Sequence, residues 1–310
     1  MKMKPQFLVI ICILCISISS ILYSETVVEI GSHSLQQRQV VVDTPMIIKY
    51  DCEIIHYFQN NPILKKLPNN KVEVIISDYT SMGDDNKPAT LIADFSEKYN
   101  LPYTVTKKNI TIIRSKKCVR LEEDIIGNTS SGIIEVYDGK DTKLFKHDTL
   151  KSVDGKKTIE TKFGQIFLGR EENKINRFYP FDLWLVRELK PESALVKSEE
   201  GLFKIKIDDD SGTYEFALSP SDNYMKRSHH ISRDKYSEDL IVNKTVKIGN
   251  LVLPADVEIN QYRGEKLLPE RLTHYTNFVY EIITDEKAAS LCNFEFPEGT
   301  KMGKIISSSY

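Results

Sequence analysis

Short runs of alternating apolar and polar residues recur along most of this chain. The clearest is Phe-Lys-Ile-Lys-Ile at residues 203–207, which has the period of two expected for a strand with one buried face. An acidic turn ending at Gly212 separates it from the run 213–218, and the two runs together predict an antiparallel hairpin. Similar runs occupy residues 40–50, 132–137, 157–168, 240–248, 251–262 and 272–283. The pattern predicts a mainly β fold.

The connections between these runs are short and rich in glycine. Asp138-Gly139 and Gly249-Asn250 each separate two apolar runs, and such pairs favour hairpins because they tolerate positive φ. Successive hairpins predict an antiparallel meander. No rhythm of strand, helix and strand is visible, which disfavours a Rossmann or TIM-barrel architecture.

The run 272–283 is apolar in part on both of its sides, which suits a curved sheet whose second face is partly covered or lines a pocket. Strict alternation places these residues in two sets: Leu272, His274, Thr276, Phe278, Tyr280 and Ile282 on one side, and Thr273, Tyr275, Asn277, Val279, Glu281 and Ile283 on the other.

Helical patterns are few. Residues 89–100 place Leu91, Ile92, Phe95 and Tyr99 on roughly one helical face, and residues 181–190 form a second short candidate. With the strand patterns around it, the first helix gives a small β-α-β-β unit at 71–114. We interpret this unit as an insertion or subdomain within N-terminal strands spanning residues 25–130.

Residues 1–24 have the layout of an export signal. Lys2 and Lys4 precede an unbroken apolar run at residues 7–16, and a polar stretch follows it. That run is shorter than the roughly 20 apolar residues that a membrane span needs. We therefore expect cleavage after Ser24 and a periplasmic or extracellular protein. An uncleaved membrane anchor is the alternative.

Charge and cysteine content narrow the function classes. The 310 residues carry 42 Lys and Arg against 44 Asp and Glu, so no bulk positive charge favours nucleic acid. Cys52, Cys118 and Cys292 remain after cleavage of the signal. Either one pair forms a disulfide and leaves one thiol, or all three are small buried hydrophobes. The chain has no C-x-x-C motif and no Cys/His cluster, so we expect no structural zinc site.

Catalytic and phosphate-binding motifs such as G-x-S-x-G, H-E-x-x-H and G-x-x-x-x-G-K-[ST] do not occur. The one local set that could hold a metal is His229 and His230 with Asp222, Asp234 and Glu238. Adjacent histidines in a strand point to opposite faces, so we interpret this set as a solvated polar strand end. The sequence therefore predicts neither a metal nor a cofactor.

From about residue 131 onward, the order of short motifs resembles the LolA-like family of exported lipoprotein carriers and their outer-membrane-lipoprotein-sorting relatives. The motifs are Tyr-Asp-Gly-Lys at 137–140, Asn-Arg-Phe-Tyr-Pro-Phe-Asp-Leu-Trp at 176–184, Ser-Pro-Ser-Asp-Asn-Tyr at 219–224, Gly-Asn-Leu-Val-Leu-Pro at 249–254 and Phe-Glu-Phe-Pro-Glu-Gly-Thr at 294–300. The resemblance implies that residues 131–310 form an unclosed half β-barrel, a curved antiparallel sheet with a few short helices as a lid. It also implies a partner that is a lipid, an acyl chain or a lipoprotein.

Such a half-barrel would hide acyl chains from water on its concave face. Candidate cavity residues are Phe216, Ile259, Phe278 and Tyr280 on the late strands, with Phe181 and Trp184 on the lid; plain core packing is the alternative for each. The arginine that anchors the closed lid in true carriers has no matching position here. Two other hypotheses stay open: an envelope module that recruits another protein through its sheet edges, and a hydrolase with its site near His229, His230 or His274.

Overall fold

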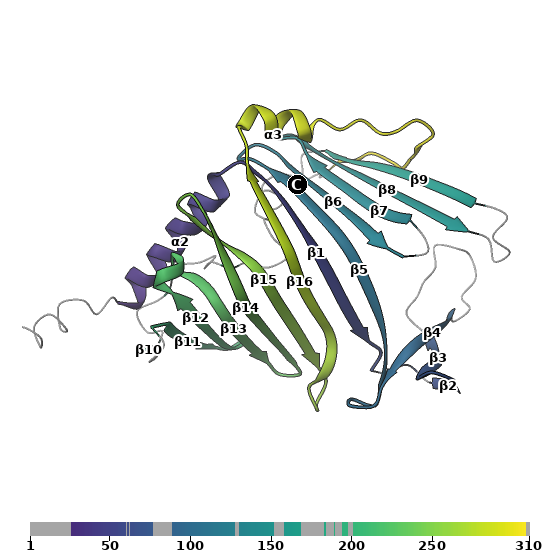
Figure 1. The fold of residues 1–310 in the computed structure, drawn as a ribbon, viewed down its shortest axis with the longest axis horizontal. Coiled ribbons are helices and arrows are strands. Elements are labelled where there is room, and N and C mark those ends of the chain that lie inside the picture. Colours follow the sequence, from purple (N-terminus) through teal and green to yellow (C-terminus); the bar gives the residue numbers. More distant parts are fainter. Residues whose placement is uncertain are drawn as a thin grey trace, which may run out of the picture.

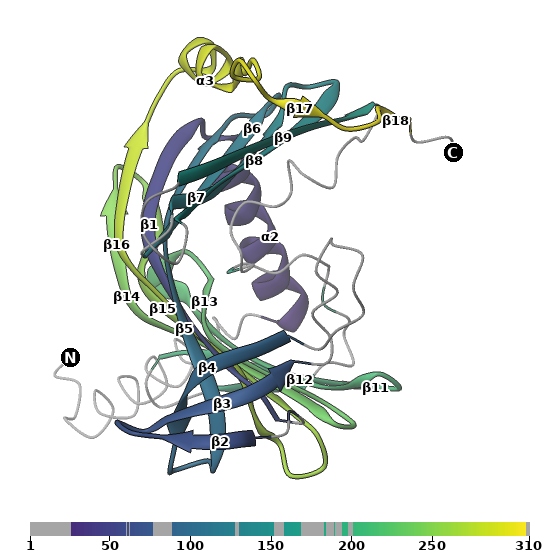
Figure 2. The same ribbon diagram turned by 90° about the vertical axis from the view of Figure 1, so that its right-hand side faces the viewer.

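A computed structural model describes residues 26–59, 61, 63–76, 89–127, 130–151, 158–168, 183, 189, 194–197 and 201–307. The expected export signal lies outside these residues, as do Phe181 and Trp184 and the helix expected around them. Within the described residues the chain forms one large, strongly curved sheet that does not close on itself, together with two α-helices (Figures 1 and 2). The prediction of a mainly β fold on an unclosed curved sheet is confirmed.

Thirteen strands form the main body of the sheet, each antiparallel to its neighbours. From edge to edge they are β10 (Ala194–Lys197), β11 (Phe203–Asp209), β12 (Gly212–Ser219), β13 (Met225–Arg233), β14 (Tyr236–Ile248), β15 (Leu251–Arg263), β16 (Leu268–Ile282), β1 (Met46–Tyr57), β5 (Leu101–Arg114), β6 (Val119–Ile126), β7 (Ser130–Tyr137), β8 (Asp141–Lys151) and β9 (Thr158–Leu168).

Two smaller sets of strands extend this body. β2 (Ile63–Leu67), β3 (Lys71–Ile76) and β4 (Ala89–Ser96) continue antiparallel from the start of β5. The short β17 (Lys301–Met302) and β18 (Ile306–Ser307) pair in parallel with β9 and cover that edge of the sheet.

Strand β1 joins the early and late parts of the chain. It pairs with β5 along its whole length on one side and with β16 on the other. The expected boundary between residues 130 and 131 falls at the start of β7, after its first residue, and β7 is a neighbour of β6 in the sheet. Strands from both sides of that boundary therefore share one curved surface, and β1 lies at its centre.

The expected hairpins are present. β11 and β12 pair antiparallel around the turn before Gly212, and β14 and β15 pair around Gly249 and Asn250. Gly249 has a φ of 58°, the left-handed conformation that its sequence context predicts.

The helix expected at residues 89–100 is wrong. Residues Ala89–Ser96 are strand β4, and a turn follows that ends with Asn100 at a φ of 55°. Ala93 is buried with Val72 and Val74 of β3, whereas Ile92 is 64% exposed. Burial therefore follows the strand period of two, because cross-strand packing against β3 outweighs the local helical spacing.

Helix α2 (Val27–Asp43), which the sequence pattern did not predict, precedes β1. It begins at a capping box in which Thr26 and Glu29 bond each other's backbone N–H. The strand expected from residue 40 therefore begins only at Met46. Figure 2 shows α2 inside the curve of the sheet, where Val27 and Ile30 pack with residues of β11 and β12.

The second helix, α3 (Asp285–Cys292), follows β16. The Thr284 hydroxyl caps it by accepting a hydrogen bond from the backbone N–H of Lys287. The helix lies across the end of the sheet beside β5 and β6 (Figure 1), and the chain then continues to β17 and β18.

The strict alternation expected for residues 272–283 is interrupted by a β-bulge at Asn277. Two residues of β16, Asn277 and Phe278, oppose Tyr50 of β1, and Asn277 has a φ of 56°. Beyond the bulge the faces are exchanged, so Phe278 packs on the same core as the buried Tyr275, and Val279 is exposed. The two-sided apolar pattern thus comes from a shift of register within one strand.

This bulge gives a testable stability effect. Asn277→Val places a β-branched residue at positive φ and removes the 2.7 Å hydrogen bond from Asn277 Nδ2 to Asp51 Oδ2. We expect it to lower the free energy of unfolding by about 2 kcal/mol. Asn277→Gly loses only the hydrogen bond and should cost no more than about 1 kcal/mol. Urea unfolding of both variants measures the difference. Equal stabilities of the two variants would contradict a bulge with Asn277 at positive φ.

Candidate ligand-binding site

The inner face of the sheet contains a cavity of about 380 Å³ where β16, β1, β5 and β6 lie side by side. Its lining residues alternate along each strand, since only every second side chain points inward. They are Arg271 and Tyr275 of β16; Tyr50, Cys52 and Ile54 of β1; Lys108, Ile110 and Ile112 of β5; and Leu121 and Glu123 of β6.

The part of the cavity wall around Tyr50, Ile110 and Ile112 is apolar and aromatic. Ile110 and Ile112 belong to the main hydrophobic core. Tyr50 packs edge-on to Tyr275 with ring centroids 5.8 Å apart, and stacks on Phe278 at 4.9 Å. Such ring pairs fix large side chains in one arrangement and leave an apolar surface for a ligand.

Charged groups lie at one end of the same cavity. Lys108 Nζ and Glu123 Oε2 are 2.6 Å apart, and each side chain is about one quarter exposed. Arg271 is exposed at this end. The cavity is therefore amphipathic, with apolar side chains along much of its wall and, at Arg271, a cation that solvent reaches.

The thiol and phenol in the cavity wall are neutral groups at ordinary pH. Burial raises the pKa of Cys52 to about 11, although Lys108 and Arg271 oppose the shift. Burial also raises the pKa of Tyr275, and the charge of Cys52 in its thiolate form would add to this. Both side chains thus contribute to an uncharged lining.

The candidate cavity residues from the late strands occupy three different places. Phe278 and Tyr280 pack against the main core beside Tyr50, and their rings stack 5.8 Å apart. Ile259 is buried in that core. Phe216 lies on β12 with the cluster beneath α2, and it lines a separate hollow of about 430 Å³ over β11 to β14.

None of the candidate cavity residues that the structure describes lines the 380 Å³ cavity, and eight of its ten lining residues lie on β1, β5 and β6, before residue 130. The alternation along residues 46–57 and 101–114 was the available signal. It could not show that these two strands are neighbours, or that β16 lies beside them.

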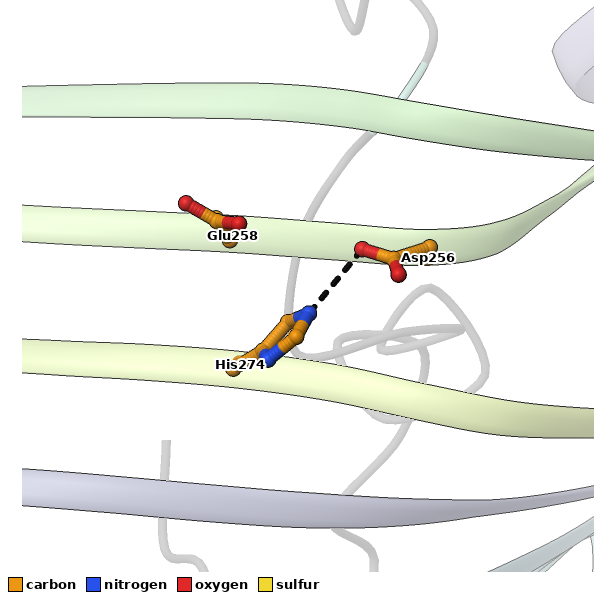
Figure 3. Close-up of side chains that lie close together, drawn as sticks. All are labelled: Asp256, Glu258 and His274. Carbon is orange, nitrogen blue, oxygen red and sulfur yellow. Dashed lines mark hydrogen bonds and ion pairs between the residues drawn. The ribbon is translucent and has the colours of Figure 1, made fainter.

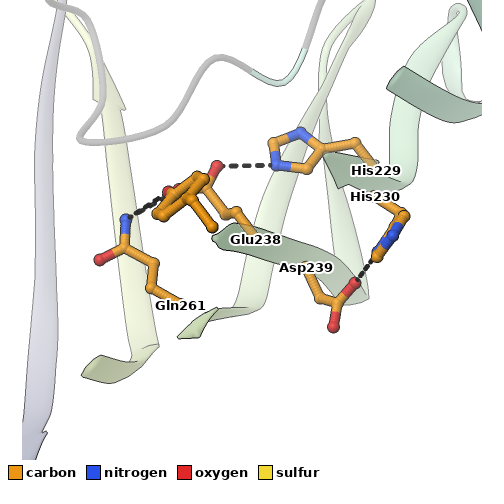
Figure 4. Close-up of polar contacts among 6 residues, drawn as sticks. His229, His230, Glu238, Asp239 and Gln261 are labelled. Carbon is orange, nitrogen blue, oxygen red and sulfur yellow. Dashed lines mark hydrogen bonds and ion pairs between the residues drawn. The ribbon is translucent and has the colours of Figure 1, made fainter. Parts of the chain in front are cut away.

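A polar network lies on the inner face where the middle of β13, the start of β14 and the end of β15 are side by side (Figure 4). His229 Nε2 lies 3.0 Å from Glu238 Oε1, and the other carboxylate oxygen, Oε2, accepts hydrogen bonds from Tyr236 and Gln261. Burial alone would raise the pKa of Glu238, but the hydrogen bonds from His229, Gln261 and Tyr236 outweigh it and hold the pKa at about 2. The carboxylate stays ionised and also raises the pKa of Tyr275 nearby.

The five residues considered as a metal set do not converge on one point. His230 bonds Asp239 at 2.6 Å on the opposite side of the strands from His229, as the period of two requires (Figure 4). Asp222 pairs with Arg227, and Asp234 lies in the turn between β13 and β14. Only His229 and Glu238 of that set meet.

Among the described residues, one group of three possible metal ligands comes together: Asp256, Glu258 and His274 on the outer face of β15 and β16 (Figure 3). His274 Nε2 bonds Asp256 Oδ1 at 3.0 Å. The Asn243 amide donates to Asp256 and to Glu258, also at 3.0 Å each. The carboxylate oxygens of Asp256 and Glu258 thus already bond partly exposed neighbouring side chains, and we assign no ion to them. The sequence could not show this group because Glu258 and His274 meet only through strand pairing.

The fold defines a mainly β protein built on an unclosed, curved antiparallel sheet with an amphipathic cavity on its concave face. In the part of the chain that the structure describes, no helix is both long and apolar enough to cross a membrane. Comparison with protein-family models finds no match for this chain, and a search of curated proteins finds none either.

Proposed function

We propose that this chain is an exported, non-enzymatic protein of the cell envelope that holds a lipid or another apolar ligand in the concave cavity of its sheet. The observation that carries the proposal is the 380 Å³ cavity, whose volume lies in the range of roughly 300–1,000 Å³ found for small-molecule sites. Export is supported by the sequence pattern of residues 1–24. The resemblance of the later motifs to LolA-like carriers supports the same ligand class.

Physical chemistry favours an elongated amphiphile as the ligand. An acyl chain against Ile110, Ile112 and Leu121 would gain about 25 cal/mol for each Å² of apolar surface hidden from water. Its polar end would then reach the charged end of the cavity near Arg271. A ligand with one apolar and one anionic end satisfies both parts of the lining.

Binding is tested by titrating the delipidated protein with a fluorescent long-chain fatty acid. We expect saturable uptake with one dominant site. Delipidated, folded protein that shows no saturable uptake of this probe or of a fluorescent phospholipid would contradict it.

Replacing the cation at the cavity mouth should separate the contribution of the headgroup from that of the chain. We expect Arg271→Ala to weaken binding of a fatty acid about tenfold, because a charge-assisted hydrogen bond contributes about 1.5 kcal/mol. Binding of the fatty alcohol of equal length should change less than twofold. Arg263→Ala is the matched control, since that arginine lies at the end of β15 and pairs with Glu270. Equal losses for acid and alcohol would show that Arg271 does not contact the headgroup.

A further inference from the structure

Two of the three cysteines in the described part of the chain meet in the fold. Cys118 lies immediately before β6, and Cys292 is the last residue of α3. Both side chains are almost completely buried in one hydrophobic cluster. Cys292 Sγ lies 4.0 Å from the carbonyl oxygen of Ile113, and Ser115 Oγ lies 3.4 Å from Cys118 Sγ, so both thiols face the end of β5 and the turn after it. Cys292 lowers the pKa of Cys118, and Cys118 raises the pKa of Cys292. Cys52 is in the cavity wall, in a different part of the core.

The backbone on both sides of this pair is held in place. The turn before Cys118 is closed by a 2.9 Å hydrogen bond from Ser115 N to Cys118 O. Arg120 Nη1 donates to Leu291 O at 2.9 Å, and Lys143 Nζ donates to Phe294 O at 3.0 Å. These bonds hold the backbone on either side of Cys292 against β6 and β8, and thereby keep its side chain in the cluster that contains Cys118.

A C-terminal strap, which we define as residues 293–307, starts at this pair. The Phe294 ring packs near Phe145 of β8, and the strap then pairs with β9 through β17 and β18. The strap covers the edge of the sheet at β9, which would otherwise offer unpaired backbone groups to another strand. A bond that holds Cys292 in place therefore also holds the start of the C-terminal strap that covers this edge.

We propose that Cys118 and Cys292 form a disulfide that fastens the C-terminal strap to the sheet, while Cys52 stays a thiol. The sequence alone left open which pair, if any, is bridged. The geometry of the pair selects Cys118 and Cys292 independently of ligand binding, and only the presence of an oxidant in the cell rests on the proposed export.

The reaction is an ordinary thiol–disulfide exchange. Before the two side chains are buried, either thiol can lose its proton and attack; we take Cys118 as the attacking thiolate. It displaces one thiolate from an external disulfide and forms a mixed disulfide. Cys292, after losing its proton, attacks the Cys118 sulfur and releases the second external thiol. Two protein thiols are oxidised and one external disulfide is reduced. Because both sulfurs are buried once the chain is folded, the bond forms during folding and is then shielded.

The pair is tested by refolding the full chain in a glutathione redox buffer, alkylating the remaining thiols after denaturation, and mapping the peptides. We expect a linked peptide containing Cys118 and Cys292, with Cys52 alkylated. Two alkylated thiols at Cys118 and Cys292, glutathione retained on either, or a bridge to Cys52 would each overturn the proposal.

Matched variants test the effect on stability. A reductant should lower the thermal unfolding midpoint of the oxidised protein by about 5–10 °C. It should not change the midpoint of Cys292→Ser, and Cys52→Ser should behave like the original chain. A midpoint in the original chain that does not respond to the reductant would contradict the strap-fastening role. Uptake of the fatty-acid probe by the same oxidised samples separates failure of this proposal from failure of the ligand proposal.

Discussion

Filling the concave cavity should weaken uptake of the fatty-acid probe by about fiftyfold or more. Ile54 and Leu121 are only partly buried and point into the cavity from β1 and β6, so the double variant Ile54→Trp/Leu121→Trp can place two indole rings there without displacing the buried core. A ligand that loses about 100 Å² of buried apolar surface loses about 2.5 kcal/mol, which is roughly seventyfold in Kd.

Val279→Trp is the matched control for this variant. Val279 is on the outer face of β16 and 60% exposed, so an indole ring there adds the same bulk to the sheet but leaves the cavity open. Thermal unfolding of both proteins checks that each is folded. Unchanged probe affinity in a folded double variant would place the ligand elsewhere, for example in the hollow beside Phe216.

Acid should destabilise the protein through Glu238. The pKa of Glu238 is about 2 in the folded protein against an ordinary value of 4.5, so its stabilisation is complete above pH 4.5 and is lost as the pH falls toward 2. The full shift corresponds to about 3 kcal/mol, and partial solvent exposure reduces this to about 2 kcal/mol. Urea unfolding between pH 2.5 and pH 7 measures the loss.

Glu238→Gln should flatten this pH dependence and lower stability at pH 7 by about 2 kcal/mol. An amide cannot match the carboxylate as an acceptor for His229, Tyr236 and Gln261 together. Asp239→Asn is the control, because Asp239 is the next residue on the same strand, points to the opposite face and is about one third exposed. An acid response that is equally steep in Glu238→Gln and in the original chain would contradict the role of this network.

The hairpins of this fold could be predicted because their signals are local. Gly212 and Gly249 lie where alternating runs meet, and strand pairing follows directly from such turns. Residues 89–96 show the limit of local reasoning. Their apolar spacing suits a helix, and only pairing with the neighbouring strand β3 makes them the strand β4. Helix α2 was missed although Thr26 and Glu29 form a capping box, because the apolar residues at its end resemble the start of a strand.

The cavity could not be predicted because it depends on contacts between distant segments. Tyr50, Ile112 and Arg271 come from β1, β5 and β16, and β1 lies between the other two only in the folded sheet. The bulge at Asn277 also exchanges the faces of β16, which brings Phe278 to the same side as Tyr275. The late strands therefore supply Arg271, Tyr275 and nearby aromatic residues, whereas the other eight lining residues come from β1, β5 and β6.

The central claim is that the concave face holds an elongated amphiphile, and photo-crosslinking tests it most directly. A fatty acid with a diazirine near the end of its chain is bound to the delipidated protein, irradiated, and mapped by peptide mass spectrometry. Because the end of the chain lies away from the headgroup, we expect adducts concentrated near Tyr50, Ile110, Ile112 and Leu121 and few near Arg271, and their loss when unlabelled fatty acid is added in excess. Adducts confined to the outer face, or no adduct that unlabelled ligand displaces, would contradict it.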